Sequence, residues 1–109
     1  MGDLNHKYLV TGAAGFIGFH LCNELIKKNK FVLGFDNLND YYDRSLKVAR
    51  LKVLENSALK SNSSWCFIKG NLEDLGLLQE TFKKYRPNIV INLAAQAGVR
   101  YSIQNPLSY

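Results

Sequence analysis

The chain has 109 residues, 47% hydrophobic, 12% aromatic and 21% charged, and 14 Lys and Arg against 9 Asp and Glu give a formal net charge of +5. This balance is typical of a folded globular chain and excludes a disordered or collagen-like one. No apolar run approaches the ~20 residues that cross a bilayer and the N-terminus lacks a signal-peptide pattern, so we expect one domain, cytoplasmic and without a membrane partner.

Apolar runs and helical periodicities alternate along the chain. The apolar runs predict four strands, at 7–11, 31–35, 65–69 and 88–93. Apolar spacings of three and four predict helices at 15–29, about 43–56 and from 75 to Pro87, with a polar loop at 57–64 and a fourth helix starting near 105. Strands that are apolar throughout favour a parallel sheet covered on both faces. The predicted fold class is therefore α/β, a Rossmann-type doubly wound parallel sheet of about four strands in the order 3-2-1-4.

The second predicted helix separates apolar from basic residues. Leu46, Ala49 and Val53 fall on one face, and the basic residues are expected to form the solvated face: Arg44, Lys47, Arg50 and Lys52. No basic stripe is interleaved with aromatic residues, so nucleic acid is not an expected partner.

Cysteine and histidine residues are few. Cys22 and Cys66 are expected to be reduced thiols rather than a disulfide framework. His6 and His20 are isolated in the sequence, so no metal site is expected.

Three glycines follow the first predicted strand at intervals of three, in Thr11-Gly-Ala-Ala-Gly-Phe-Ile-Gly18. Between a strand and a helix, this spacing is typical of dinucleotide binding. Gly12 allows a tight turn, Gly15 lets backbone N–H groups approach a pyrophosphate, and Gly18 lets the helix pack closely. The helix N-terminus offers unpaired donors and a positive dipole end. The alternative is an ordinary glycine-bearing turn.

Asp36 ends the second predicted strand, 18 positions after Gly18. The expected spacing for an acidic residue that binds the adenosine ribose hydroxyls is about 20. A carboxylate there would repel a 2′-phosphate, which favours NAD over NADP. The alternative is that the Asp-Asn pair serves only as turn chemistry.

These segments resemble a known family. Thr11–Gly18 resembles the opening of the extended short-chain dehydrogenase/reductases, the NAD-dependent nucleotide-sugar epimerases and dehydratases. The segments 36–51 and 92–109, with Asp36-Asn-Leu-Asn-Asp-Tyr-Tyr-Asp43 and Asn92-Leu-Ala-Ala-Gln-Ala-Gly-Val-Arg-Tyr-Ser102, resemble the UDP-glucuronate 4-epimerases. The resemblance runs through nearly the whole chain.

The resemblance implies an NAD site that extends toward a sugar substrate. The implied cofactor-binding residues are Gly12, Gly15, Phe16, Ile17 and Gly18 at the pyrophosphate, Asp36 and Asn37 at the adenosine ribose, Asn71 and Leu72 at the adenine, and Leu93, Ala94, Ala95 and Gln96 near the second ribose. The substrate-end candidates are Val99, Arg100 and Tyr101, with a solvated surface role as the alternative for Arg100. Asn71 stands where the family usually has Asp, which removes a charge-assisted hydrogen bond to the adenine.

The family's chemistry needs a Tyr-x-x-x-Lys pair, and none occurs in this chain. We therefore expect no catalytic residue here. We expect residues 1–109 to be the NAD-binding N-terminal part of a longer isomerase that is inactive alone and lacks the C-terminal sugar-binding domain.

The implied reaction interconverts UDP-glucuronate and UDP-galacturonate by oxidation and re-reduction at C4. Two alternatives stay open: dehydration, decarboxylation or reduction of a nucleotide sugar on the same fold, and a non-catalytic nucleotide-binding module. The expected partners are a UDP-sugar and a second copy in a full-length homodimer. The 109 residues alone are expected to self-associate through the exposed edge of the fourth strand.

Overall fold

The computed structural model describes residues 6–38, 44–93 and 102–104. In chain order the elements are β1 (Lys7–Thr11), α1 (Phe16–Lys27), β2 (Phe31–Asp36), α2 (Arg44–Ser61), β3 (Trp65–Lys69), α3 (Leu75–Tyr85), β4 (Ile89–Asn92) and β5 (Ser102–Gln104). Within these ranges no helix is long and apolar enough to cross a membrane.

The strands form one sheet in the order β3-β2-β1-β4-β5. The first four are parallel, each joined to the next in sequence through a helix, so the predicted α/β class and the order 3-2-1-4 are confirmed. The sequence did not predict β5, which pairs antiparallel with β4 along Val90–Asn92. The edge of β4 that was expected to be open is therefore paired over these residues.

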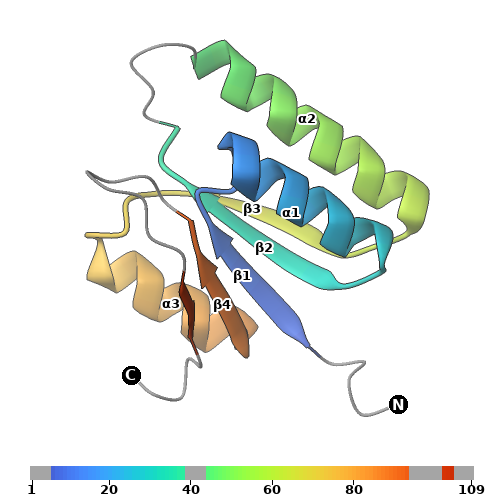
Figure 1. The fold of residues 1–109 in the computed structure, drawn as a ribbon. Helices are drawn as coiled ribbons and strands as arrows, with labels where there is room; N and C mark the ends of the chain where they lie inside the picture. The colour runs from blue at the N-terminus through green and yellow to red at the C-terminus, as the bar shows by residue number, and fades with distance from the viewer. Residues whose placement is uncertain (1–5, 39–43, 94–101, 105–109) are drawn as a thin grey trace.

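Helices cover both faces of the sheet. In Figure 1, α1 and α2 lie on one face and α3 lies on the other. Side chains alternate between the faces, so Val10 and Val32 join a cluster under α1 and α2, while Leu9 and Leu33 join a cluster under α3. Successive residues of a strand are therefore buried on opposite faces of the sheet, which explains why these strands are apolar throughout.

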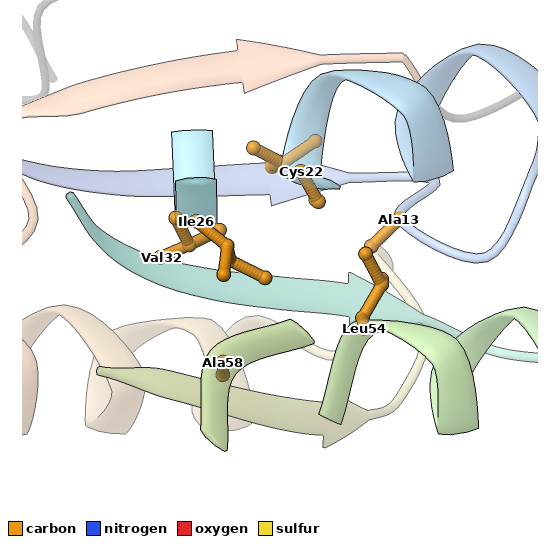
Figure 2. Close-up of a cluster of buried hydrophobic side chains, with 7 residues drawn as sticks. Ala13, Cys22, Ile26, Val32, Leu54 and Ala58 are labelled. Carbon is orange, nitrogen blue, oxygen red and sulfur yellow. The ribbon is translucent and has the colours of Figure 1, made fainter. Parts of the chain in front are cut away.

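The cluster under α1 and α2 holds the glycine loop against the sheet. Figure 2 shows Cys22 and Ile26 of α1 converging with Val32 of β2 and with Leu54 and Ala58 of α2.

Both cysteines, Cys22 and Cys66, are free thiols, as predicted. Burial raises the pKa of Cys22 from 9.0 to about 12, because the thiolate loses its solvation.

Helix α2 differs from its prediction in length and in its buried face. It continues to Ser61, five residues past the predicted end, because Ala58 extends the buried face of Leu54 by one turn. Tertiary packing here outweighs the weak helix propensity of the residues expected to form a loop. The predicted apolar face was wrong, since Leu46 and Val53 are 46% and 47% exposed.

Helix α3 begins and ends as its sequence indicates. The Asp74 carboxylate caps it by accepting a hydrogen bond from the N–H of Leu77 at 3.0 Å. Arg86 follows the helix in the left-handed conformation, directly before Pro87. The predicted stop at Pro87 is thus confirmed.

Candidate functional site

The predicted site residues that the structure describes lie near one edge of the sheet. Parallel strands β1, β2, β3 and β4 end side by side there, and in such sheets ligands bind outside the carboxyl ends of the strands. Ten predicted cofactor residues lie within the described ranges: Gly12, Gly15, Phe16, Ile17, Gly18, Asp36, Asn37, Asn71, Leu72 and Leu93. The other three predicted cofactor residues, Ala94, Ala95 and Gln96, and the three substrate-end candidates, Val99, Arg100 and Tyr101, lie outside the described residues.

The turn after β1 is fixed against the end of β2. Gly12 has φ 70°, in the left-handed region that side chains disfavour. The N–H groups of Gly12 and Ala13 both donate to the carbonyl of Phe35, at 2.8 and 3.2 Å. The carbonyl of Gly12 turns back to accept from the N–H of Gly15 at 3.0 Å. The glycine loop, residues 12–15, is therefore a hydrogen-bonded turn that is anchored to the end of β2.

The spacing to Gly18 is required by contact between α1 and this loop. A Cβ on Gly18 would lie 2.0 Å from the carbonyl oxygen of Gly12, and one on Gly15 would lie 3.3 Å from the same oxygen. The helix approaches the loop so closely that only glycine fits at position 18.

The first turn of α1 presents hydrogen-bond donors toward the site. Its N-cap residue, Gly15, supplies no side-chain acceptor. Within the described part of the chain, the backbone N–H groups of Phe16, Ile17 and Gly18 have no acceptor. Three such donors at the positive end of a helix dipole make a favourable position for an anion.

The carboxylate of Asp36 is buried beside the glycine loop. Its Oδ2 accepts from the N–H of Ala14 at 3.0 Å, and its Oδ1 accepts from the N–H of Leu38 at 2.7 Å. Lys47 adds an ion pair, with Nζ 3.2 Å from Oδ1. Asp36 thus links the end of β2 to the loop after β1 and to α2.

Two basic residues of α2 were wrongly assigned to a solvated face. Lys47 binds Asp36, and Arg50 donates from Nη1 to the carbonyl of Ala14 at 3.0 Å. The Arg50 guanidinium also lies 5.9 Å from the ring centre of Phe16. Both residues face inward because they share the helix face of Leu54, seven positions after Lys47 and four after Arg50. That spacing identifies both residues only once the burial of Leu54 is known from the structure.

The loops after β2 and β3 are joined. The side-chain amide of Asn37 donates to the Oδ1 of Asn71 at 3.0 Å, so the structure brings these two predicted cofactor residues together. Leu72 packs against the cluster under α3.

A hydrogen bond between Thr11 and Asn92 joins the ends of β1 and β4, and neither residue was predicted as a site residue. The hydroxyl of Thr11 bonds to the Oδ1 of Asn92, and the N–H of Leu93 reaches that hydroxyl oxygen at 3.0 Å. Leu93 itself packs against the cluster under α1 and α2. The sequence signal that could have identified this pair is a polar residue at the end of each of two strands that are predicted to be neighbours.

Comparison with known proteins found a matching family and similar proteins. The family described as GDP-mannose 4,6 dehydratase matches residues 9–109. Protein CapI of Staphylococcus aureus is 48% identical over 103 residues, which are 94% of this chain and 29% of that protein. UDP-glucuronate 4-epimerase 4 of Arabidopsis thaliana is 48% identical over 101 residues, which are 93% of this chain and 22% of the plant protein. The chain therefore spans less than a third of the length of these relatives.

Solved structures share the fold. UDP-glucose 4-epimerase of Thermotoga maritima, crystallised with UDP-glucose, is 35% identical with a TM-score of 0.64, covering 84% of this chain and 25% of that one. UDP-glucose 4-epimerase of Brucella ovis, in complex with NAD, is 29% identical with a TM-score of 0.61, covering 85% of this chain and 24% of that one.

Proposed function

Since the chain belongs to the family described as GDP-mannose 4,6 dehydratase, we propose that it forms the NAD-binding part of a nucleotide-sugar 4-epimerase. The observation that carries the proposal is the arrangement around the first turn of α1. Three backbone donors without acceptors in the described chain lie beside a closed glycine turn, and a carboxylate from the neighbouring strand binds that turn.

The donors of Phe16, Ile17 and Gly18 would hold the diphosphate of NAD. Backbone N–H groups at a helix N-terminus suit a diphosphate because they offer hydrogen bonds and a positive dipole end together. Gly15, the N-cap residue of α1, carries no side chain that could block this approach, and its backbone is extended, with φ −74° and ψ 170°.

Asp36 would hold the adenosine ribose. Among the described residues its Oδ2 has one donor, the N–H of Ala14, which leaves a lone pair for a ribose hydroxyl. Asn37 would lie beside Asp36 at the ribose, and Asn71 and Leu72 would border the adenine. The hydrogen bond between the exposed side chains of Asn37 and Asn71 would join these two parts of the site. Leu93, which directly follows β4, would continue the site, and the remaining proposed residues at 94–96 and 99–101 lie outside the described residues.

The relatives support a reaction and a substrate for the whole protein. When bound, NAD supplies the acceptor and donor of the hydride that oxidation and re-reduction of a sugar carbon require. Relatives named as UDP-glucuronate 4-epimerases support UDP-glucuronate as the substrate of the whole protein. Because this chain contains no Tyr-x-x-x-Lys pair, the acid–base residues and the sugar-binding domain would come from another part of the protein.

Self-association and a full-length homodimer also remain proposals. The described outer strands of the sheet are β3 and β5, so association through a sheet edge would involve one of these strands rather than β4.

The second candidate function is 4,6-dehydration of a nucleotide sugar, favoured by the family description. Two parallel incubations of the whole protein with NAD separate the two reactions, one with UDP-glucuronate and one with a neutral nucleotide sugar such as GDP-mannose. UDP-galacturonate is the expected product, whereas a 4-keto-6-deoxy sugar formed from a neutral nucleotide sugar would support dehydration.

Calorimetric titration of the 109-residue chain with NAD tests the binding proposal. We expect binding that Asp36→Ala weakens about tenfold, which is the effect of losing a hydrogen bond to a charged group. The control is Glu55→Gln, which removes an exposed negative charge from α2 and should leave the affinity unchanged. If Asp36→Ala bound NAD as tightly as the wild-type chain, the proposed site would be refuted.

A further inference from the structure

A shielded ion pair holds the carboxylate that is proposed to bind the adenosine ribose. The Nζ of Lys47 lies 3.2 Å from the Oδ1 of Asp36, and the side chains are only 15% and 3% exposed. An ion pair this well shielded from water is screened less than a surface pair.

The hydrogen bonds at Asp36 are unevenly divided between its two oxygens. Oδ1 accepts from Lys47 and from the N–H of Leu38, which uses both of its lone-pair directions. Oδ2 accepts only from the N–H of Ala14 among the described residues. One acceptor position therefore remains for a ribose, at Oδ2, while the charge of the carboxylate is balanced by the ammonium at Oδ1.

The ion pair with Lys47 changes the electrostatic effect of Asp36 on a 2′-phosphate. An acidic residue at this place favours NAD because its negative charge repels the additional phosphate of NADP. With Lys47 paired to it, the net charge of the two side chains is zero. The repulsion falls, and the ammonium offers attraction to an anion nearby.

We propose that Lys47 is a specificity-determining residue that weakens the discrimination of Asp36 against NADP. This inference rests on the proposed function, since it assumes that the adenosine ribose binds at Asp36. The wild-type chain would still prefer NAD, because only the carboxylate oxygen offers an acceptor to the 2′-hydroxyl. Without the ammonium, the preference would become much stronger.

Arg50 is the nearest alternative for this role, and its contacts point elsewhere. Its guanidinium binds the carbonyl of Ala14 and lies over the ring of Phe16, so it supports the glycine loop. Of these two cations, only Lys47 contacts the carboxylate.

The test is the ratio of dissociation constants for NADP and NAD, measured by calorimetry on the whole 109-residue chain at low salt. The two cofactors differ only by the 2′-phosphate, so a purely structural effect of a substitution changes both constants and leaves the ratio unchanged. Lys47→Met should raise the ratio about tenfold or more, because unit charges a few ångströms apart interact strongly in a partly buried site. Lys47→Gln also removes the charge but keeps a hydrogen-bond donor, and it should raise the ratio similarly.

Two controls isolate the position and the charge. Lys52→Met removes the same charge from an exposed position on the same helix and should change the ratio less than about threefold, because an exposed charge is screened by water and salt. Lys47→Arg keeps the charge and should preserve the wild-type ratio. Far-ultraviolet circular dichroism and the fluorescence of Trp65, the one tryptophan of the sequence, confirm folding of each variant.

The outcomes separate this inference from the proposed function. If NAD binds and Asp36→Ala weakens it, but Lys47→Met and Lys47→Gln leave the ratio within threefold of wild type, the role of Lys47 is refuted alone. If the wild-type chain does not bind NAD, or if Asp36→Ala changes neither constant, the proposed function fails and this inference fails with it.

Discussion

Replacing Gly18 with alanine tests the closest contact in the candidate site. The new Cβ would lie 2.0 Å from the carbonyl oxygen of Gly12 and 2.8 Å from its carbonyl carbon. Cβ contacts shorter than 3.0 Å essentially do not occur, so helix and loop must separate by about 1 Å or more. The obstacle is backbone in a hydrogen-bonded turn, which cannot rotate aside as a flexible side chain can.

The magnitude follows from two opposing effects. Forcing an additional methyl group into a packed contact costs about 1–3 kcal/mol. Alanine in a helix gains about 0.5–1 kcal/mol over glycine. Gly76→Ala in α3 is the matched control, because its Cβ would meet its nearest neighbour, the Oδ1 of Asp74, at an ordinary 3.6 Å. We therefore expect Gly18→Ala to be less stable than Gly76→Ala by about 2 kcal/mol.

The assay is urea denaturation followed by the fluorescence of Trp65, which packs against the cluster under α1 and α2. NAD titration adds a second readout, since displacing the donors of the first helical turn should weaken binding about tenfold through loss of one hydrogen bond to a charged group. If Gly18→Ala matched Gly76→Ala in stability and bound NAD as wild type does, the steric reasoning about the loop would be refuted.

Four further outcomes are expected. Competition titration of the wild-type chain should show tighter binding of NAD than of NADP, and the reverse would contradict the placement of Asp36 at the ribose. Arg50→Met should weaken the binding of NAD and of NADP by a similar factor, because Arg50 supports the glycine loop. We expect about threefold to tenfold for one lost hydrogen bond, and an effect on NADP alone would contradict this role. Because the pKa of Cys22 rises from 9.0 to about 12 on folding, its contribution to stability is complete below pH 9 and is lost as the pH rises toward 12. The difference in unfolding free energy between wild type and Cys22→Ala should shrink over that range, and a constant difference would argue against a buried thiol. The chain with NAD and UDP-glucuronate should form no UDP-galacturonate, because loss of an acid–base pair alone costs about 10²–10⁴ in rate; turnover would mean that a residue such as Tyr101 acts as base.

The sequence by itself determined the parallel core of the fold and the position of the glycine turn. Strands apolar on both faces, helices between them and glycines spaced by three are local patterns, and each requires knowledge of only a few neighbouring residues. The same holds for Asp36 as the last residue of β2 and for Pro87 as the residue that stops α3.

Only the tertiary structure decided which groups meet at the site and which face of α2 is buried. Lys47 and Arg50 read as solvent-exposed because a charged residue on a helix usually is, yet packing of Leu54 under α2 turns both toward the glycine loop. The C-terminal end of α2 depends on packing, and the antiparallel strand β5 depends on pairing with β4. Neither of these contacts is evident from the sequence. Contacts between segments far apart in the chain are set by the free energy of the whole packed arrangement, which no local periodicity encodes.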